Sequence, residues 1–378
     1  MTRRCCESHS VGYMPKRGKS ATSIDADVLR HWRVLGVESD VLNARLAYTE
    51  IEGVARYVRM MHGVARVYPG FLPTQASGRW STTNPPLVNF PPDCVNPTCP
   101  EGEHQVTVQC WSARDTVGPD PGWWWLHYDL DAIEGKVADA DAGDTEALEA
   151  YAKGWDVHTI RACHAFHHAL PPDLTKRCHT DESCQTWRES WAPPWTGVED
   201  RRRHIIKTLG YATQYAISPK GVLQARDIEK LGLTPTELVK FAKLYLKSRP
   251  VLVARKNVVW DECAHDGVSY SWYGRRRRLY GDWNTRAKEG WSHRISATVT
   301  DLQNQVLIAT THTFPECHLV LNSHDGLTFA FPVSHPVEAT KDTVARLVEV
   351  PRTSPTGHTF VSTAAWEWID DQLVKRRL

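Results

Sequence analysis

Two acidic residues, each next to an apolar run, most strongly constrain the folds that this 378-residue chain can adopt. Asp129 follows the run 123–128, which is typical of a buried strand. Asp325 and Gly326 lie between two further apolar runs, and Asp-Gly in that position is a strong hairpin signal. Simple turn chemistry would by itself account for Asp325. If the fold brings the two carboxylates together, they can hold magnesium, which prefers oxygen ligands.

A helix is predicted between the two acids, over about 200–216. Arg203, Lys207, Tyr211 and Tyr215 recur every four residues, so they share one slowly turning face of that helix. The two cations lie toward the helix N-terminus, where the dipole also favours anions. A nucleoside triphosphate has the same polarity, with phosphates at one end and a flat base at the other. The alternative is an ordinary amphipathic helix with a cationic surface.

Taken in order, these blocks resemble motifs A, B and C of the family A (DNA polymerase I-like) DNA polymerases. DLDAIE from residue 129 is similar to the family's D-Y-S-Q-I-E. The helix matches R-x3-K-x3-F/Y-x3-Y-G from residue 203, with Ala216 in place of the usual glycine. His324 and Asp325 match H-D-E, but Gly326 replaces its glutamate. The likeness extends from about residue 16 to the C-terminus through further segments at 16–29, 77–91, 154–159, 218–250 and 272–279.

The resemblance implies a site for two magnesium ions and a nucleoside triphosphate. Asp129 and Asp325 would hold the metals, helped by the backbone carbonyl of Leu130. The phosphates would be held by Arg203, Lys207 and His158. Tyr211 would stack on the sugar and base, and Tyr215 would border the template.

The resemblance also implies DNA as the nucleic acid. Glu134 corresponds to the family's glutamate that blocks a ribose 2′-hydroxyl, which argues against an RNA polymerase. The implied contacts to primer-template backbone and minor groove are Arg79, Asn89, His324, Arg275 and Arg276. Minor-groove acceptors are nearly the same for every base pair, so such contacts test pairing without reading sequence.

Several residues depart from the family pattern. Gly326 removes the third carboxylate of the site, and strand alternation would place Asp131 beside Asp129 as a partial replacement. The family's Asn and Gln before motif C correspond to the shorter Ser296 and Thr300. These changes predict weaker minor-groove checking or lower activity rather than a different reaction.

The implied fold is α+β, with an antiparallel palm sheet and an inserted helical fingers subdomain. We expect a partial thumb at 1–73, palm at 74–151 and 271–378, and fingers at 152–270. Helices are expected around 25–35 and 42–62. We expect no proofreading exonuclease, because the D-x-E triplets at 144–146 and 227–229 fall inside the region that resembles the polymerase motifs. The short thumb leaves three alternatives: a distributive enzyme, a split enzyme whose thumb or exonuclease is a separate chain, or a fragment of a longer reading frame.

The composition indicates the cellular compartment rather than the function. The net charge of +1 does not by itself indicate nucleic-acid binding, which would depend on local basic clusters such as 275–278. The sequence has no long apolar stretch and no apolar leader, so we expect an intracellular, cytoplasmic protein. The short thumb suggests a phage or plasmid origin. Ten scattered cysteines fit a reducing compartment. Two sets resemble zinc ligands loosely, but we do not expect zinc there: Cys94, Cys99, His104 and Cys110, and Cys178, His179 and Cys184.

The sequence therefore predicts a template-directed DNA polymerase that adds dNTPs to a primer by two-metal nucleotidyl transfer, without proofreading. The alternative is a catalytically degenerate or split-polymerase subunit that binds primer-template DNA or a partner chain.

Overall fold

The structure is a computed structural model, and two compact units are recognised in it. Met1–Gly53 with Asp156–Arg249 form one, here called the helical unit, and Val54–Trp155 with Pro250–Leu378 form the other, here called the sheet unit. These units place 250–270 with the sheet, whereas the predicted subdomain boundaries grouped it with the fingers; the subdomain assignments remain predictions. The residues that the structure describes are 29, 32, 37, 39–67, 69–72, 75–83, 85–89, 103–105, 117–165, 201–215, 219–224, 228–231, 233–323 and 325–377.

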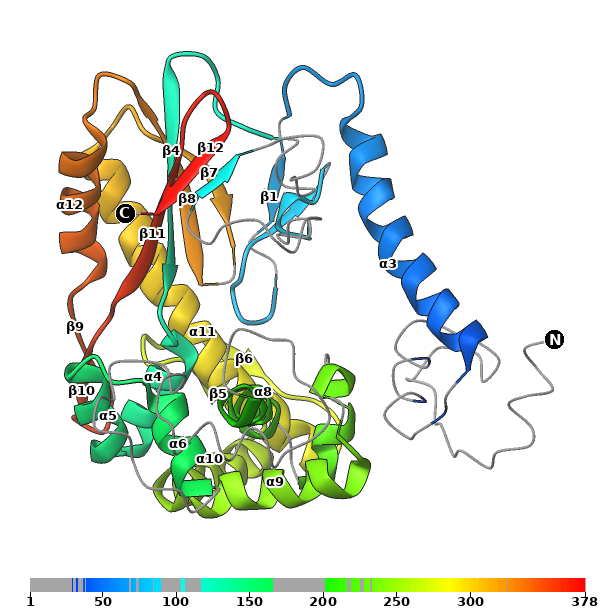
Figure 1. Cartoon of the computed structure of the whole chain (residues 1–378). Helices are drawn as coiled ribbons and strands as arrows, with labels where there is room; N and C mark the ends of the chain where they lie inside the picture. The colour runs from blue at the N-terminus through cyan, green and yellow to red at the C-terminus, as the bar shows by residue number, and fades with distance from the viewer. Residues whose placement is uncertain are drawn as a thin grey trace, which may run out of the picture. The chain divides into compact units, whose positions relative to one another are not determined.

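The sheet unit is built on a six-stranded antiparallel sheet (Figure 1). Its strands, in spatial order, are β3 (Glu103–Gln105), β12 (Val374–Arg377), β11 (Ala364–Ile369), β4 (Trp123–Leu130), β8 (Gly326–Pro332) and β7 (His318–Asn322). Every neighbouring pair is antiparallel. Together with the helices around it, this sheet confirms the predicted α+β class.

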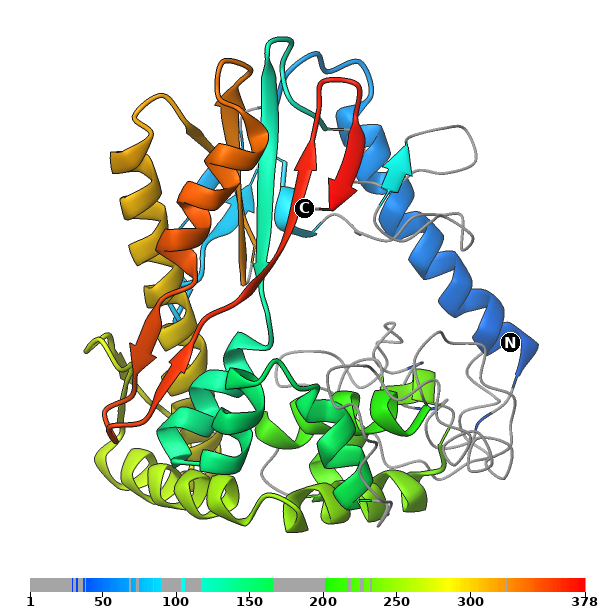
Figure 2. The ribbon, with the colours of Figure 1, turned by 60° about the vertical axis from the view of Figure 1, so that its left-hand side comes forward.

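Strand β4 separates a covered face of the sheet from a polar one. Trp124, Leu126 and Tyr128 are buried, whereas the alternate residues His127 and Asp129 point to the opposite face. The long helix α11 (Trp283–Thr313) and α12 (Val337–Val348) lie along the covered side, as Figure 2 shows. The predicted strand therefore presents its acid on the face that these helices leave open.

The predicted hairpin is confirmed by β7 and β8. Its register pairs Asn322 with Leu327 and Leu319 with Phe329, with an irregularity between Leu319 and Leu321. Ser323 and Gly326 exchange backbone hydrogen bonds that close the turn around Asp325. Because β8 is buried along 326–331, the turn is held by a rigid strand.

Two further helices of the sheet unit, α4 (Ile133–Ala142) and α10 (Pro250–Asp266), pack with each other, and α11 packs against both. A short ribbon, β5 (Val268–Tyr270) with β6 (Arg276–Arg278), connects α10 to α11. The remaining elements are α5 (Thr145–Ala152), β1 (Gly70–Leu72), β2 (Ser81–Thr83), η1 (Leu87–Asn89), β9 (Pro351–Thr353) and β10 (Thr359–Val361).

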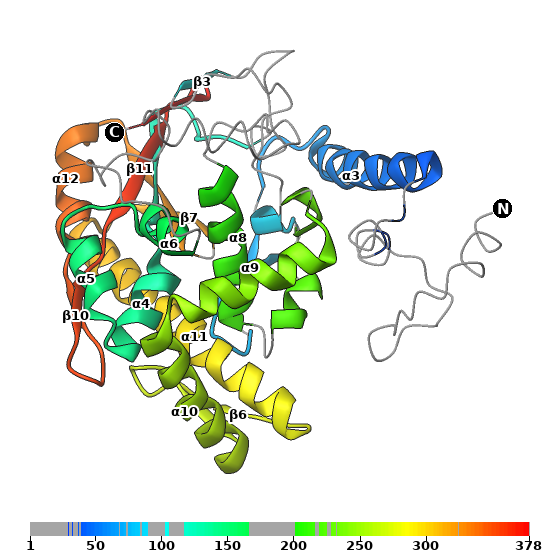
Figure 3. The ribbon, with the colours of Figure 1, turned by 60° about the horizontal axis from the view of Figure 1, so that its bottom comes forward.

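The helical unit contains α6 (Val157–Ala165), α8 (Arg201–Tyr215) and α9 (Pro235–Lys247), with short 3₁₀ turns at η3 (Pro219–Gln224) and η4 (Ile228–Leu231) (Figure 3). Helix α8 confirms the helix predicted at 200–216. Its apolar residues Ile205 and Leu209 pack with Leu238, Phe241 and Tyr245 of α9. A capping box formed by Thr234 and Glu237 fixes the start of α9.

Helix α3 (Asp40–Met61) confirms the helix predicted around 42–62. The one predicted around 25–35 lies almost wholly outside the described residues. Within the described part of the chain, no helix is long and apolar enough to cross a membrane.

Candidate active site

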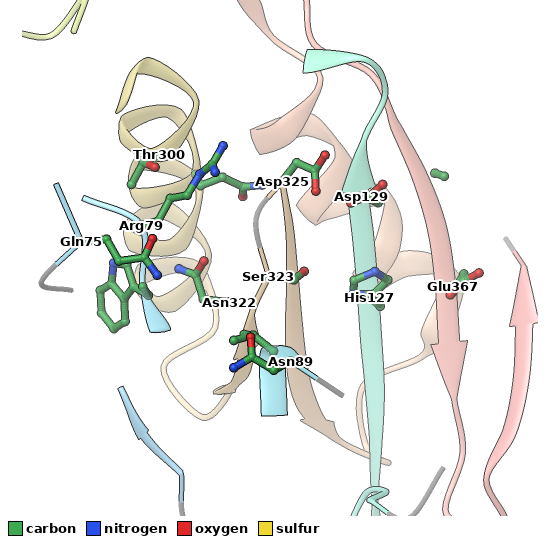
Figure 4. A pocket seen from close by; sticks show the side chains of 14 residues that line it. Gln75, Arg79, Asn89, His127, Asp129, Thr300, Asn322, Ser323, Asp325 and Glu367 are labelled. Atoms are coloured by element: carbon green, nitrogen blue, oxygen red, sulfur yellow. The ribbon is translucent and has the colours of Figure 1, made fainter. Parts of the chain in front are cut away.

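A cavity of about 530 Å³ opens on the polar side of the sheet unit (Figure 4). It brings together four of the predicted site residues: Arg79, Asn89, Asp129 and Asp325. They come from three separate stretches of sequence, the 75–89 segment, β4 and the hairpin turn. In Figure 4, Arg79 lies on one side of Asp325, and Asp129 lies on the other.

Asp129 and Asp325 are adjacent because of the strand register. Asp129 on β4 is paired with Gly326 on β8, and the Leu130 amide donates to the backbone carbonyl of Asp325 across 2.9 Å. The pKa of Asp129 is raised to about 7. Burial of its carboxyl is the largest cause, followed by the negative charge of Asp325 and by the hydrogen bond between the two carboxyls. The pair therefore retains a proton that a divalent cation could replace.

The chemistry of this pair fits magnesium, whose preferred ligands are oxygens and which usually takes one or two carboxylates. Among the described residues, no group of three or more His, Cys, Asp or Glu could hold a metal. A magnesium ion held by the two aspartates would complete its coordination with backbone oxygens, water or a substrate. The two cysteine-histidine sets considered for zinc lie outside the residues whose side chains are described.

The raised pKa of Asp129 predicts a pH-dependent gain in stability for Asp129→Asn. The folded state binds this proton more tightly than the unfolded state, so ionisation begins to cost stability above the ordinary pKa of 3.8, and the cost is complete above about 7. In metal-free buffer, the variant should gain about 1 kcal/mol over wild type at about pH 8, a small figure because solvent still reaches part of this carboxyl and screens it. At about pH 4 it should gain almost nothing, because the folded wild type keeps its proton. Thermal denaturation at both pH values measures this. Asp342→Asn, at an exposed position of α12, is the control, and an equal gain at both pH values would contradict the prediction.

Gly326 is required by a close backbone approach. A Cβ atom at this position would lie 2.4 Å from the Tyr128 carbonyl oxygen and 3.1 Å from Cε1 of His127. Tyr128 lies in the middle of the sheet, so its carbonyl cannot move away cheaply. The fold therefore leaves no room here for the motif C glutamate. The close approach of the two strands explains why this chain has glycine at position 326.

Restoring that side chain should consequently harm the protein. We expect Gly326→Glu, and also the smaller Gly326→Ala, to lower the free energy of unfolding by about 1–3 kcal/mol, because the clash begins at Cβ. Thermal melting tests this. Gly135→Ala in helix α4 is the control, since its Cβ would meet only the Tyr151 hydroxyl, at 3.2 Å. A Gly326→Ala variant as stable as wild type would show that the two strands can separate freely.

Arg79 and Glu134, predicted as a DNA contact and a sugar gate, form an ion pair. The Arg79 Nη2 donates to Oε1 of Glu134 at 2.5 Å and to the Ser296 hydroxyl at 3.2 Å, and that hydroxyl also donates to Glu134 at 3.3 Å. Ser296 thus contacts both predicted residues although it is shorter than the family's side chain. The carboxylate of Glu134 is fixed at the start of α4, where the helix dipole also favours it.

The alternation argument for Asp131 does not apply, because β4 ends at Leu130 and Ala132 adopts a left-handed conformation. Asp131 instead donates its backbone amide to the Thr363 carbonyl at 2.8 Å. Its negative charge nevertheless contributes to raising the pKa of Asp129.

In the helical unit, Arg203 is buried and paired with Asp156. Its Nε and Nη2 both donate to the Asp156 carboxylate, which also accepts from the Thr159 hydroxyl. Burial alone would raise the pKa of Asp156, but these hydrogen bonds and the Arg203 charge lower it to about 2. Sequence reasoning missed Asp156, although it lies inside the matched segment 154–159.

His158 lies close to the cationic face of α8. Burial, then the charges of Arg161, Arg203 and Lys207, lower the pKa of His158 to about 3, against the opposing effect of Asp156, so its imidazole is neutral at pH 7. Its ring centroid lies 6.1 Å from that of Tyr211, whose side chain is partly exposed. His158, Arg203, Lys207 and Tyr211 are thus grouped in one unit, as predicted; Tyr215, half-buried, ends the same helix.

The remaining predicted DNA contacts differ in their exposure. Arg275 is bound to Asp301 through hydrogen bonds of 2.6 and 2.8 Å, and its guanidinium lies against Gly78. Arg276 is exposed on β6. His324 lies outside the described residues, so its predicted role remains untested.

Several lining residues of the cavity were missed by sequence reasoning, among them His127, Gln303 and Glu367. His127 lies two positions before Asp129 on the same strand face, so alternation could have indicated it. Its Nδ1 is hydrogen-bonded to the Thr328 hydroxyl at 2.9 Å, and Glu367 is its register partner on β11.

Comparison with known proteins gives relatives of one kind. No family model matches the chain. It is 23% identical over 340 residues to the thermostable DNA polymerase I of Thermus thermophilus, covering 85% of this chain and 35% of that protein. It is 24% identical over 356 residues to DNA polymerase I of Geobacillus stearothermophilus, covering 88% and 34%. The chain thus spans about a third of the length of these relatives.

A solved structure shares the fold. The POL domain of Pol1 from M. smegmatis, in complex with a DNA primer-template and dNTP, has a TM-score of 0.66 and 18% sequence identity. The match covers 93% of this chain and 57% of the other. The predicted polymerase fold is therefore confirmed.

Proposed function

Since the chain is related to DNA polymerase I, a family A polymerase, over most of its length, we propose that it is a template-directed DNA polymerase. It would extend a primer 3′-hydroxyl with dNTPs. The observation that carries this proposal is the adjacency of Asp129 and Asp325 at a cavity that also contains Arg79 and Asn89. The fold thus brings together motif residues that are distant in sequence, which supports a shared site.

Asp129 and Asp325, with the Leu130 carbonyl, would hold two magnesium ions. When bound, these ions would lower the pKa of the primer hydroxyl and neutralise charge on the triphosphate. The buried hydrogen bonds of Asp156 would keep the Arg203 guanidinium oriented. Arg203 and Lys207 would supply positive charge to the phosphates, and the neutral His158 would donate a hydrogen bond without needing a proton from solvent.

Arg79, Asn89, Arg275, Arg276 and His324 would contact the primer-template. The matched solved structure contains such a DNA and a dNTP, which supports both as partners of this chain. The absence of a proofreading activity and the presence of a separate thumb or exonuclease chain remain predictions.

The proposal is tested by primer extension on a short primed DNA template, with dNTPs and magnesium at low salt, since phosphate contacts weaken steeply with salt. We expect extension by the template-complementary nucleotide, and none without template or magnesium. Intact binding of primer-template without extension would favour the degenerate or split-enzyme alternative, for which Gly326, Ser296 and Thr300 argue. Absence of both binding and extension would overturn the proposal.

Glu134→Ala should relax discrimination against ribonucleotides. Removing the carboxylate opens space at the sugar, so the rNTP-to-dNTP ratio of insertion efficiency should rise by about 10-fold or more. The ratio is the appropriate measurement because the variant also frees Arg79, which can lower both rates together. Glu149→Ala, on the exposed side of α5, is the control. An unchanged ratio would remove Glu134 from the sugar gate.

A further inference from the structure

Gln303 of helix α11 is a buried amide beneath the wall of the cavity. It is 2% exposed and lines the same cavity as Asp129 and Asp325. Its Oε1 accepts a 2.7 Å hydrogen bond from the Tyr128 hydroxyl. Its Nε2 is shielded from solvent and has no hydrogen-bond partner in the described part of the chain. A buried donor left unpaired is costly, so this nitrogen indicates a missing acceptor.

Tyr128 determines which end of the amide faces that acceptor. Burial raises the pKa of the Tyr128 hydroxyl well above its ordinary value, against a smaller lowering by Arg352, so it remains a donor. A guanidinium such as that of Arg352 only donates hydrogen bonds, and this favours directing the hydroxyl proton toward Gln303. The Gln303 oxygen is thereby occupied, and its NH₂ group is the end left for a ligand.

A second donor at the cavity has the same property. The Nε of Arg79 is buried without a partner among the described residues, while its Nη2 is bound to Glu134 and Ser296. Two unpaired N–H groups at one cavity point to a ligand with more than one acceptor.

The charges of the cavity restrict that ligand to neutral acceptors. Asp129, Asp325 and Glu367 line it, and the charge of Arg79 is already paired with Glu134. The proposed magnesium ions would hold phosphates at Asp129 and Asp325, but elsewhere in the cavity the carboxylates would repel a phosphate. The minor-groove edge of a base pair instead offers uncharged acceptors, N3 of purines and O2 of pyrimidines, at nearly the same place in every pair.

We propose that Gln303 donates a hydrogen bond to the minor-groove edge of a base pair near the primer end. This inference rests on the proposed function. The chain would thus keep an amide side chain that contacts the minor groove, although Ser296 and Thr300 are too short for this contact. That side chain lies further along α11. The Thr300 hydroxyl is bound to the Ser296 carbonyl within the helix, which is consistent with its having lost that role.

The test is a thermodynamic cycle between Gln303 and one acceptor atom of the DNA. Primer-templates carry a single 3-deazapurine, which lacks the N3 acceptor, at each of the terminal base pairs in turn. Dissociation constants are measured by fluorescence anisotropy for wild type and Gln303→Leu. Wild type should lose about 3- to 10-fold in affinity at one base pair, and Gln303→Leu should bind unmodified DNA more weakly by a similar factor. At that base pair, the variant should lose less than about twofold further.

Two more variants keep the test decisive. Gln305→Leu has the same substitution two residues along α11, at an exposed position outside the cavity, and should behave like wild type. Gln303→Leu leaves the Tyr128 hydroxyl unpaired, so Tyr128→Phe/Gln303→Leu provides a variant in which both partners are apolar. It should fold normally and still show the same loss of affinity.

Additive effects of the variant and the 3-deazapurine at every base pair would overturn the inference and would mean that a buried water satisfies the amide. Failure of wild type to bind any primer-template would instead overturn the proposed function. The two outcomes are therefore distinguishable.

Discussion

Asp325→Asn is expected to lower the rate of nucleotide insertion by about 10³-fold or more while leaving primer-template binding intact. Metal-held charge stabilisation contributes several kcal/mol to a reaction of this type, and each 1.4 kcal/mol is about tenfold in rate. Asparagine keeps the shape of the side chain but removes the charge that would hold the cation. Because Asp325 already faces another carboxylate, removing its charge should not weaken binding of anionic DNA. Single-turnover insertion and DNA anisotropy, measured on the same preparation, separate the two quantities.

The matched control for Asp325→Asn is Asp342→Asn, which makes the same change at an exposed position of α12. Asp129→Asn should cause a loss of similar size, and the double variant should be little worse than either single one, since the two residues act as a unit. Retention of a tenth or more of the activity in Asp325→Asn would contradict the proposed metal site. If activity in that variant then depended on Asp131 or Glu367, one of these carboxylates would hold the metal in place of Asp325.

Local patterns were sufficient to predict the elements that carry the site. The apolar run 123–128, the Asp-Gly turn and the four-residue spacing from 203 to 215 each depend on near neighbours in sequence, and the structure has a strand, a hairpin and a helix at those places. Order along the chain then allowed the family resemblance to be recognised. Strand alternation does not give the direction of Asp131, because β4 ends at Leu130 and Ala132 is left-handed, although the charge of Asp131 still acts on Asp129.

Contacts between distant residues could not be predicted in this way. Tyr128 and Gln303 are separated by 175 positions, and nothing near Gln303 marks it as different from the polar residues that follow it. The need for Gly326 follows from the approach of the neighbouring strand rather than from turn chemistry. Asp156 was missed because its partner, Arg203, lies 47 positions away. In each case the decisive quantity is a distance across the fold.

Asp141→Ala should be the most destabilising single substitution considered. Its side chain is fully buried and accepts hydrogen bonds from Arg255 at 3.0 Å, from Arg294 at 2.6 Å and from the Trp272 indole at 3.0 Å. Removing it leaves two cations without their shared anion in a poorly solvated place, which typically costs about 3–5 kcal/mol. Thermal or denaturant unfolding of the full chain measures the loss, with Asp261→Ala on the exposed side of α10 as the control. A change within about 0.5 kcal/mol would show that water reaches both arginines.

The same substitution connects stability to the site. Asp141 lies in the last turn of α4, which carries Glu134 in its first turn, and through Arg294 it holds α11, which carries Ser296 and Gln303. Loosening this connection should therefore lower insertion activity below the temperature at which the protein unfolds. The triple variant Asp141→Leu/Arg255→Met/Arg294→Met removes all three charges together, so it should recover much of the stability, because apolar replacements of a buried ionic group are often neutral or better. If that variant regains stability and activity together, the ion network serves packing alone; stability without activity would mean that it also sets the position of α11 at the cavity.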